Sequence, residues 1–418
     1  MKYFCAAISF VLSLHVFGND RPKPTPETAA KVQQARAILE AWRGDSPANA
    51  SRKLHVVYWR PSDREAAPGY RQRLTRTMLD IRDYYGHEMG RLGFGKLQPG
   101  LDLAEDGLLR IHFVQSNRPD KDFSVKSGHY IRGECYPILK EAGIDGEQET
   151  LVIFTNMSRW DPDTRRVSQN SPYYASGSHV RGTAWQVDSA ILDIDSITDK
   201  GNFVYDGQYG RMSLGAYNSM FIGGITHEIG HALGLPHIRE LSAQKGIYGT
   251  ALMGSGNRTY GQERRGEGKG SFLTLAHGLR LAAHPMFSNT AKAMHEQPQA
   301  TLEDVEVETA PSSFQMRGRI AAKLPCYAVL GYWDPAGGRD YDSLSTVAIP
   351  NADGAFELSM SALPRTATGQ LRIVPLFVNG SAASFSYAGD NPFNYAFELD
   401  ADRKPALKCL HCKTPESQ

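Results

Sequence analysis

The sequence predicts an α+β protein in two parts: a domain with a twisted mixed sheet and long helices, followed by an all-β sandwich of immunoglobulin-like type. Residues 51–297 mix short apolar runs with long helical stripes, whereas residues 298–402 carry about seven short runs separated by turns. A chain of 418 residues, 41% of them hydrophobic, can fill both cores.

Residues 1–18 predict a signal peptide. Met1 and Lys2 precede an apolar run from Tyr3 to Phe17, so we expect cleavage near Gly18 and a secreted protein. The run is shorter than the ~20 apolar residues that a membrane-spanning helix needs, and no later stretch is long enough. Stable insertion into a membrane is therefore not expected.

Residues 19–50 form an N-terminal segment. Its start is rich in proline, and the apolar pattern over residues 28–42 predicts a short helix. A packing helix and a short prosegment both fit this segment.

The first domain opens with alternating elements. Residues 54–59 predict a strand because they are apolar and include adjacent valines. Residues 70–92 predict a long helix because apolar side chains recur every three or four positions. Residues 108–114 and 151–155 predict two further strands, so a strand, helix, strand, strand order is expected.

Residues 182–187 and 190–194 predict further strands, and residues 217–233 predict a helix. This helix carries the most informative motif of the chain, His227-Glu228-Ile229-Gly230-His231-Ala232-Leu233-Gly234-Leu235-Pro236-His237. His227 and His231 are four residues apart, so a helix holds both on one face. Gly234 can end the helix in the left-handed conformation, and Pro236 stops it from resuming, which returns His237 to the same side.

Three imidazoles in this arrangement predict a zinc site. Neutral histidines leave the ion its full charge and an open position, where the pKa of a bound water falls toward neutrality. Glu228, next to the first ligand, would take the proton of that water and pass it to the leaving amine. The motif therefore predicts a zinc-dependent hydrolase with His227, His231 and His237 as metal ligands.

At these positions the chain resembles the metzincin clan of zinc endopeptidases, whose signature is H-E-x-x-H-x-x-G-x-x-H followed by a methionine turn. The resemblance implies that Met253 lies beneath the metal. Some clan members carry a tyrosine two residues after this methionine, where this chain has Ser255. Tyr248 and Tyr260 could take that role or pack in the core. The match is confined mainly to residues 226–257 and assigns no subfamily.

The resemblance also implies an edge strand beside the cleft, to which an extended peptide could add. Its residues would be Gly182, Thr183, Ala184 and Trp185, the small ones admitting a substrate backbone. An interior strand with Trp185 in the core is the alternative.

Other polar residues of this domain are open to two interpretations. Loop carboxylates usually hold no metal, but four acidic residues of this domain could bind a structural calcium ion. They are Asp188, Asp193, Asp195 and Asp206. His277 and His284, in and after a predicted helix over residues 272–283, are expected to be packed side chains. Asp45 could block the metal if the N-terminal segment is a prosegment.

The second domain shows no chemistry of its own. Tyr332, Trp333 and Tyr341 could form an aromatic binding platform, although a place in the core is the better interpretation. The predicted strands cover residues 305–307, 314–320, 327–332, 346–349, 355–359, 371–378 and 395–399.

Four cysteines remain after signal cleavage and predict one or two disulfides in an oxidising compartment. Cys409 and Cys412, in a tail over residues 403–418, could pair with each other or with Cys135 or Cys326. The spacing does not decide among these pairings.

A net charge of +1 with no basic stripe excludes a nucleic-acid partner. The sequence thus predicts a secreted zinc endopeptidase whose partner is a protein or peptide substrate, with an unspecified oligomeric state. One alternative is a narrow peptidase or amidase for one partner or a cell-wall peptide. Another is a non-catalytic adhesion protein with a structural zinc ion.

Overall fold

The structure is a computed structural model and describes residues 21–44, 46, 52–337, 340–383 and 391–411. The predicted signal peptide, Asp45 and Cys412 lie outside these residues. Within them, no helix combines the length and the apolar character needed to cross a membrane.

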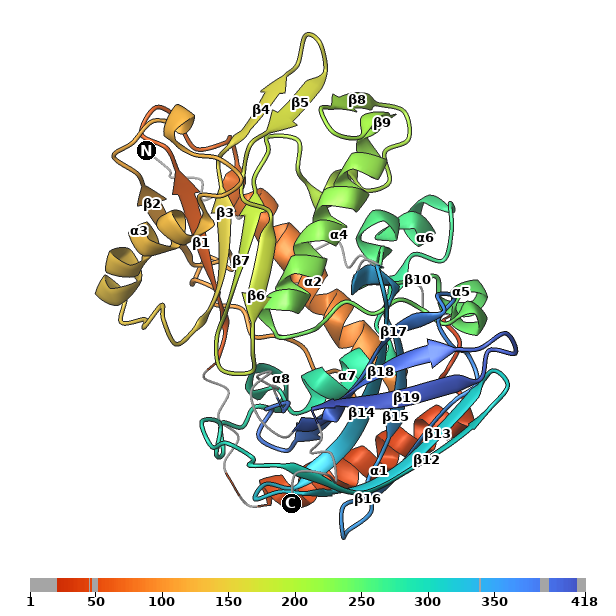
Figure 1. Cartoon of the computed structure of the whole chain (residues 1–418). Helices are drawn as coiled ribbons and strands as arrows, with labels where there is room; N and C mark the ends of the chain where they lie inside the picture. The colour runs from red at the N-terminus through yellow and green to blue at the C-terminus, as the bar shows by residue number, and fades with distance from the viewer. Residues whose placement is uncertain (1–20, 45, 47–51, 338–339, 384–390, 412–418) are drawn as a thin grey trace, which may run out of the picture.

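The first domain is built on a five-stranded mixed sheet with the order β2-β1-β3-β7-β6 (Figure 1). The first four strands of that order are parallel, and β6 runs antiparallel at the edge. The strands are β1 (Leu54–Arg60), β2 (Ile111–Gln115), β3 (Thr150–Thr155), β6 (Tyr174–Gly177) and β7 (Gly182–Val187).

Helices cover both faces of this sheet. α2 (Tyr70–Leu92) and α4 (Leu214–Ala232) share one core with the sheet, and α3 (Gly128–Glu141) shares another. The predicted helix over residues 70–92 matches α2, and the predicted helix over 217–233 matches α4 within three residues. α3 was not predicted, because Pro137 inside it weakens the helical signal.

Smaller elements surround the main sheet. The strand predicted over residues 190–194 is wrong: this stretch is irregular and leads into a short 3-10 turn, η2 (Ile194–Ser196), which begins where the Asp193 side chain accepts from the Asp195 N–H. A second sheet is formed by β4 (Ser158–Asp161), β5 (Arg166–Gln169), β8 (Phe203–Asp206) and β9 (Gly210–Ser213). The remaining elements are η1 (Asp120–Asp122), α5 (Ser242–Tyr248), β10 (Thr250–Ala251), η3 (Gly256–Thr259), α6 (Gln262–Arg265), β11 (Ser271–Phe272), α7 (Leu275–Ala282) and α8 (Pro285–Ser288).

The second domain consists of two antiparallel sheets with a shared apolar core. One has the order β12-β13-β16 and the other β15-β14-β17-β18-β19. The last strand falls within the region predicted to be a tail, so that boundary is wrong. The elements are β12 (Thr301–Ala310), β13 (Ser313–Ala321), β14 (Cys326–Pro335), η4 (Asp340–Asp342), β15 (Leu344–Ala348), β16 (Ala355–Met360), β17 (Thr368–Phe377), β18 (Asn391–Leu399) and β19 (Pro405–His411).

The N-terminal segment is a packing helix between the two domains. α1 (Pro26–Arg43) contacts α2, α7 and β14, and Trp42 packs against the cores of both domains. Ahead of it, Arg21 Nη1 donates to Glu88 Oε1 over 2.8 Å. Glu88 is fully buried, so the start of the described chain is fastened to α2.

The two domains share apolar side chains. Leu330, Tyr332 and Leu376 from the sandwich belong to the same buried cluster as Leu279 from α7. The Tyr327 hydroxyl donates to the Leu279 carbonyl. An apolar interface of this kind holds two domains in a fixed relation.

The cysteine predictions are only partly tested. Cys135 and Cys326 are free thiols, so a bridge from the tail to either of them is not supported. The pairing of Cys409 with Cys412 involves a residue outside the described range and stays a prediction.

Candidate zinc centre

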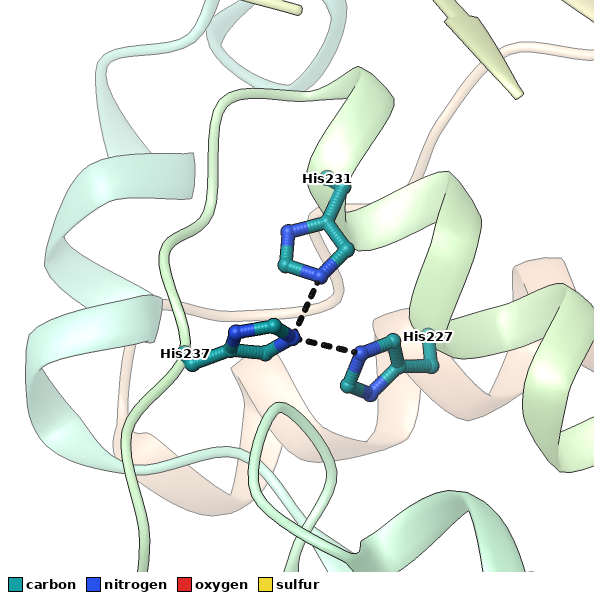
Figure 2. Close-up of side chains that lie close together, drawn as sticks. All are labelled: His227, His231 and His237. Atoms are coloured by element: carbon teal, nitrogen blue, oxygen red, sulfur yellow. Dashed lines mark hydrogen bonds between the residues drawn. The ribbon is translucent and has the colours of Figure 1, made fainter. Parts of the chain in front are cut away.

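The helix α4 and the loop that follows it bring the three motif histidines together (Figure 2). Ser213 caps the start of α4 by accepting from the Ala216 N–H. At its other end Gly234 has a φ of 82°, and Leu235 N–H donates to the Gly230 carbonyl over 2.9 Å. The chain then turns back and places His237 beside His227 and His231.

The three Nε2 atoms converge on one point. His237 Nε2 lies 3.2 Å from His227 Nε2 and 2.8 Å from His231 Nε2. The three ligand atoms all lie within 4.8 Å of one another, and they form the one group of potential metal ligands found among the described residues.

Backbone carbonyls set the orientation of two of these rings. His227 Nδ1 lies 2.7 Å from the Leu252 carbonyl, and His231 Nδ1 lies 2.8 Å from the Leu235 carbonyl. A carbonyl only accepts, so both Nδ1 atoms donate and both Nε2 atoms present lone pairs. His237 can donate to only one of them, whereas a cation satisfies all three. This donor set and its carbonyl support fit zinc.

Burial keeps His227 neutral, as a metal ligand must be. Desolvation, and then the neighbouring His231, lower the pKa of His227 to about 3. A proton therefore does not compete for its lone pair near neutral pH.

Glu228 is half-buried next to the first histidine. Desolvation raises the pKa of its carboxyl to about 8. No hydrogen bond or ion pair joins this carboxyl to another described residue, so its oxygens are available to a water or a substrate. A carboxyl in this environment can hold a proton near neutral pH.

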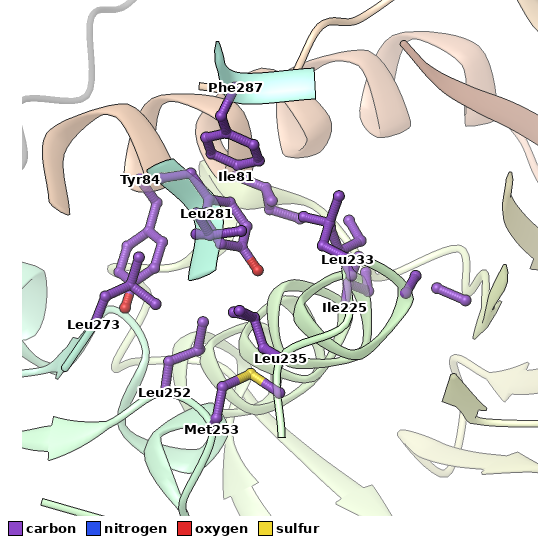
Figure 3. Close-up of a cluster of buried hydrophobic side chains, with 14 of the residues drawn as sticks. Ile81, Tyr84, Ile225, Leu233, Leu235, Leu252, Met253, Leu273, Leu281 and Phe287 are labelled. Atoms are coloured by element: carbon purple, nitrogen blue, oxygen red, sulfur yellow. The ribbon is translucent and has the colours of Figure 1, made fainter. Parts of the chain in front are cut away.

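Met253 lies under α4, the helix that carries His227 and His231. It is fully buried, and its Sδ lies 2.5 Å from the position of a Cβ built on Gly230. Figure 3 shows Met253 beside Leu252 and Leu235 in the core below α4. Because Leu252 also supplies the carbonyl that holds His227, this floor positions a predicted ligand directly.

No protein-family model and no curated protein matches the sequence. Among solved structures, the chain is similar to OgpA from Akkermansia muciniphila. A catalytically inactive form of OgpA in complex with an O-glycopeptide (glycodrosocin) substrate has a TM-score of 0.69 and 22% identity, covering 86% of this chain and 96% of that chain. A crystal structure of wild-type OgpA has a TM-score of 0.68 and 24% identity, covering 85% and 95%. The likeness shows a shared fold over both domains.

The tyrosines weighed as partners of the methionine turn have other roles. The Tyr248 hydroxyl donates to the Lys23 carbonyl, and the Tyr260 hydroxyl donates to buried Asp80. Ser255 is exposed to solvent. Neither tyrosine therefore joins the histidines, and the core alternative applies to both.

The predicted substrate-edge strand is wrong. β7, which contains Gly182, Thr183, Ala184 and Trp185, pairs with β3 on one side and β6 on the other, and all its residues are buried. A glycine is needed at position 182 because α4 packs closely there: a Cβ would lie 1.9 Å from the Ala232 carbonyl oxygen at the end of α4. The edge strand on this side of the sheet is β6, and β2 is the opposite edge.

The acidic residues considered for calcium have protein partners instead. Asp188 is buried against the Arg73 guanidinium, and the carboxylates of Asp193 and Asp195 both pair with Arg76. Asp206 accepts from the backbone N–H groups that follow it. Calcium binding is not supported.

His277 and His284 are buried and packed, as expected. His277 Nε2 lies 3.1 Å from the Pro236 carbonyl, and its Nδ1 lies 3.1 Å from the Thr274 hydroxyl. His277 therefore supports the loop that carries His237.

Tyr341 lies against the candidate zinc centre, to which the sequence did not assign it. Its ring centroid lies 3.8 Å from that of His237 and 5.9 Å from that of His227, and both contacts are stacked. The sequence favoured the core for Tyr332, Trp333 and Tyr341, and the first two are fully buried there. No local signal links a loop of the second domain to a motif about a hundred residues earlier.

Proposed function

We propose that this protein is a zinc-dependent endopeptidase in which His227, His231 and His237 hold the metal. The observation that carries the proposal is the convergence of three Nε2 atoms, two with their tautomer set by carbonyls. Glu228, next to the first of these histidines in the chain, has no hydrogen-bond or ion-pair partner among the described residues. One of these histidines is buried and two are half-buried, and converging lone pairs removed from water are costly without a ligand to satisfy them.

The chain's own residues would act through proton transfer and orientation. When bound, zinc lowers the pKa of a water and polarises a carbonyl. Glu228 would accept the proton of the attacking water and return it to the leaving amine, because no other described residue occupies its carboxyl and it follows the first ligand on the same helix. The Leu252 and Leu235 carbonyls keep His227 and His231 oriented during this cycle.

We propose an extended O-glycopeptide as the substrate. OgpA, which shares the fold, was crystallised with an O-glycopeptide substrate. In this chain β6 offers an unpaired sheet edge next to α4, to which a peptide could add as a further strand. Tyr174 on β6 is 36% exposed, and its ring lies 4.9 Å from that of buried Trp185 at a tilt of 45°. A sugar ring could pack against the exposed part of the Tyr174 ring. Export through residues 1–18 remains part of this proposal.

The test combines metal analysis with cleavage of matched peptides. We expect the purified protein to contain one zinc ion and to cut an O-glycosylated peptide faster than the same peptide without sugar, with cut sites mapped by mass spectrometry. Glu228→Gln should keep the zinc and lose about 100- to 10,000-fold of the activity, because the ligands remain and only the proton acceptor is lost.

Two results would contradict the proposal. Full activity of Glu228→Gln would remove the general base, and a protein that binds zinc but cuts neither peptide would favour a binding protein with a structural ion. Equal cleavage of both peptides would retain the endopeptidase and reject the glycopeptide.

A further inference from the structure

A loop of the second domain lies on the zinc-binding loop. η4 lies between β14 and β15 of the sandwich, and the residue that follows η4 contacts the chain just after His237. Arg239 N–H donates to the Ser343 carbonyl over 2.9 Å, and Arg239 Nη1 pairs with Asp342 Oδ1 at 3.1 Å. Two contacts thus join the loop of one domain to the metal-binding loop of the other.

The loop that contains η4 is also held by hydrogen bonds within the second domain. Ser343 is fully buried, and its hydroxyl donates to Asp334 Oδ1 over 2.6 Å. The Asp334 carboxylate in turn accepts from Nε and Nη2 of Arg372 on β17. The position of Tyr341, next to this anchor, is therefore set by the sandwich.

This anchoring places an aromatic ring against the histidines. The Tyr341 ring is inclined by 27° to that of His237 and by 19° to that of His227, in stacked geometry. A metal-bound imidazole carries part of the charge of its ion, and the electron-rich face of a phenol attracts such a ring. Tyr341 is nevertheless 41% exposed, so it does not serve to fill a core.

We infer that Tyr341 is a positioning residue of the zinc centre, supplied by the second domain, whose ring holds the His237 imidazole in place for the metal. The inference rests on the proposed zinc binding. It makes the sandwich part of the site, because the third ligand lies on a loop with no helix to hold its ring.

The experiment compares Tyr341→Ala and Tyr341→Phe with wild-type protein in the full chain. Zinc affinity is measured by competition with a chelator, and ligand geometry by the visible absorption spectrum of the Co²⁺-loaded protein. We expect Tyr341→Ala to weaken zinc binding about 2- to 10-fold and to change the Co²⁺ spectrum, because an aromatic pair contributes this much. Tyr341→Phe keeps the ring and should match wild type in both measurements.

Tyr205→Ala is the matched control, since Tyr205 is 42% exposed and lies on β8 of the other domain. It should leave zinc affinity and spectrum unchanged. Asp342→Ala removes the ion pair to Arg239 and keeps the Tyr341 side chain. It should change the Co²⁺ spectrum in the same direction as Tyr341→Ala, so it tests the inference if Tyr341→Ala folds poorly.

The outcomes separate this inference from the proposed function. Wild-type affinity and spectrum in Tyr341→Ala would overturn the positioning role, and so would a loss in Tyr341→Phe as large as in Tyr341→Ala. If wild-type protein binds no zinc, the proposed function itself fails.

Discussion

At the scale of single residues, the centre depends on backbone groups as much as on the motif. Spacing alone predicts that His227, His231 and His237 can meet, because helix periodicity and a glycine turn are local properties. The carbonyls that orient two of the rings could not be predicted, since Leu252 reaches His227 only through the tertiary fold. The place of Tyr341 could not be predicted for the same reason, because its contact with His237 depends on how the two domains dock.

His277 makes the protein sensitive to acid. Burial lowers the pKa of His277 to about 3, below the ordinary value of 6.5. The unfolded chain therefore binds a proton that the folded chain does not, and this stability is lost as the pH falls from about 6.5 toward 3. By pH 5 the loss should be about 2 kcal/mol.

Urea unfolding of the metal-free protein at pH 7 and pH 5 measures this effect. His277→Gln should reduce the difference between the two pH values by about 2 kcal/mol. His129→Gln, at an exposed site, serves as the control and should not alter it. An unchanged pH dependence in His277→Gln would show that this side chain is accessible to protons in the folded state.

At the scale of elements, the long helix α2 was predictable and the sheet edge was not. Its apolar stripe recurs over 23 residues, so the periodic signal is strong. β6 has only four residues, and strand order across a sheet leaves no periodic trace in the sequence. The small residues of β7 were therefore assigned to substrate access, whereas the structure uses Gly182 to let α4 approach the sheet.

Gly182→Ala tests this close approach. The added methyl group would meet the Ala232 carbonyl oxygen, so we expect a loss of about 1–3 kcal/mol in the free energy of unfolding and a displaced α4 end. Gly133→Ala in α3 is the matched control, because no atom lies within 4 Å of its new Cβ. It should be neutral or stabilising by up to about 1 kcal/mol. Equal stability of the two variants would mean that α4 can shift without cost.

At the scale of the whole molecule, the two domains share part of one buried core. The division into an α+β domain and a β-sandwich could be predicted from the change in pattern near residue 298, but the shared core could not, because interior residues of both domains look alike in sequence. The last strand, β19, was read as tail since the run that carries it is short and includes charged residues.

Calorimetry tests whether the two domains unfold together. We expect a single unfolding transition. Leu330→Ala, a substitution in the sandwich at the shared core, should move this whole transition to lower temperature and reduce the free energy of unfolding by about 2–5 kcal/mol. Two separate transitions, with only one of them shifted by the substitution, would show that the domains unfold independently.

The seam between the domains also limits how this architecture can be rearranged. Side chains from β14 and β17 complete the core of the first domain, and α1 packs against both domains. Replacing the C-terminal half with an unrelated sandwich, as in a modular fusion, would leave apolar side chains of the first domain exposed to solvent. Descendants of this scaffold are therefore expected to inherit the two halves together and to diversify through their loops.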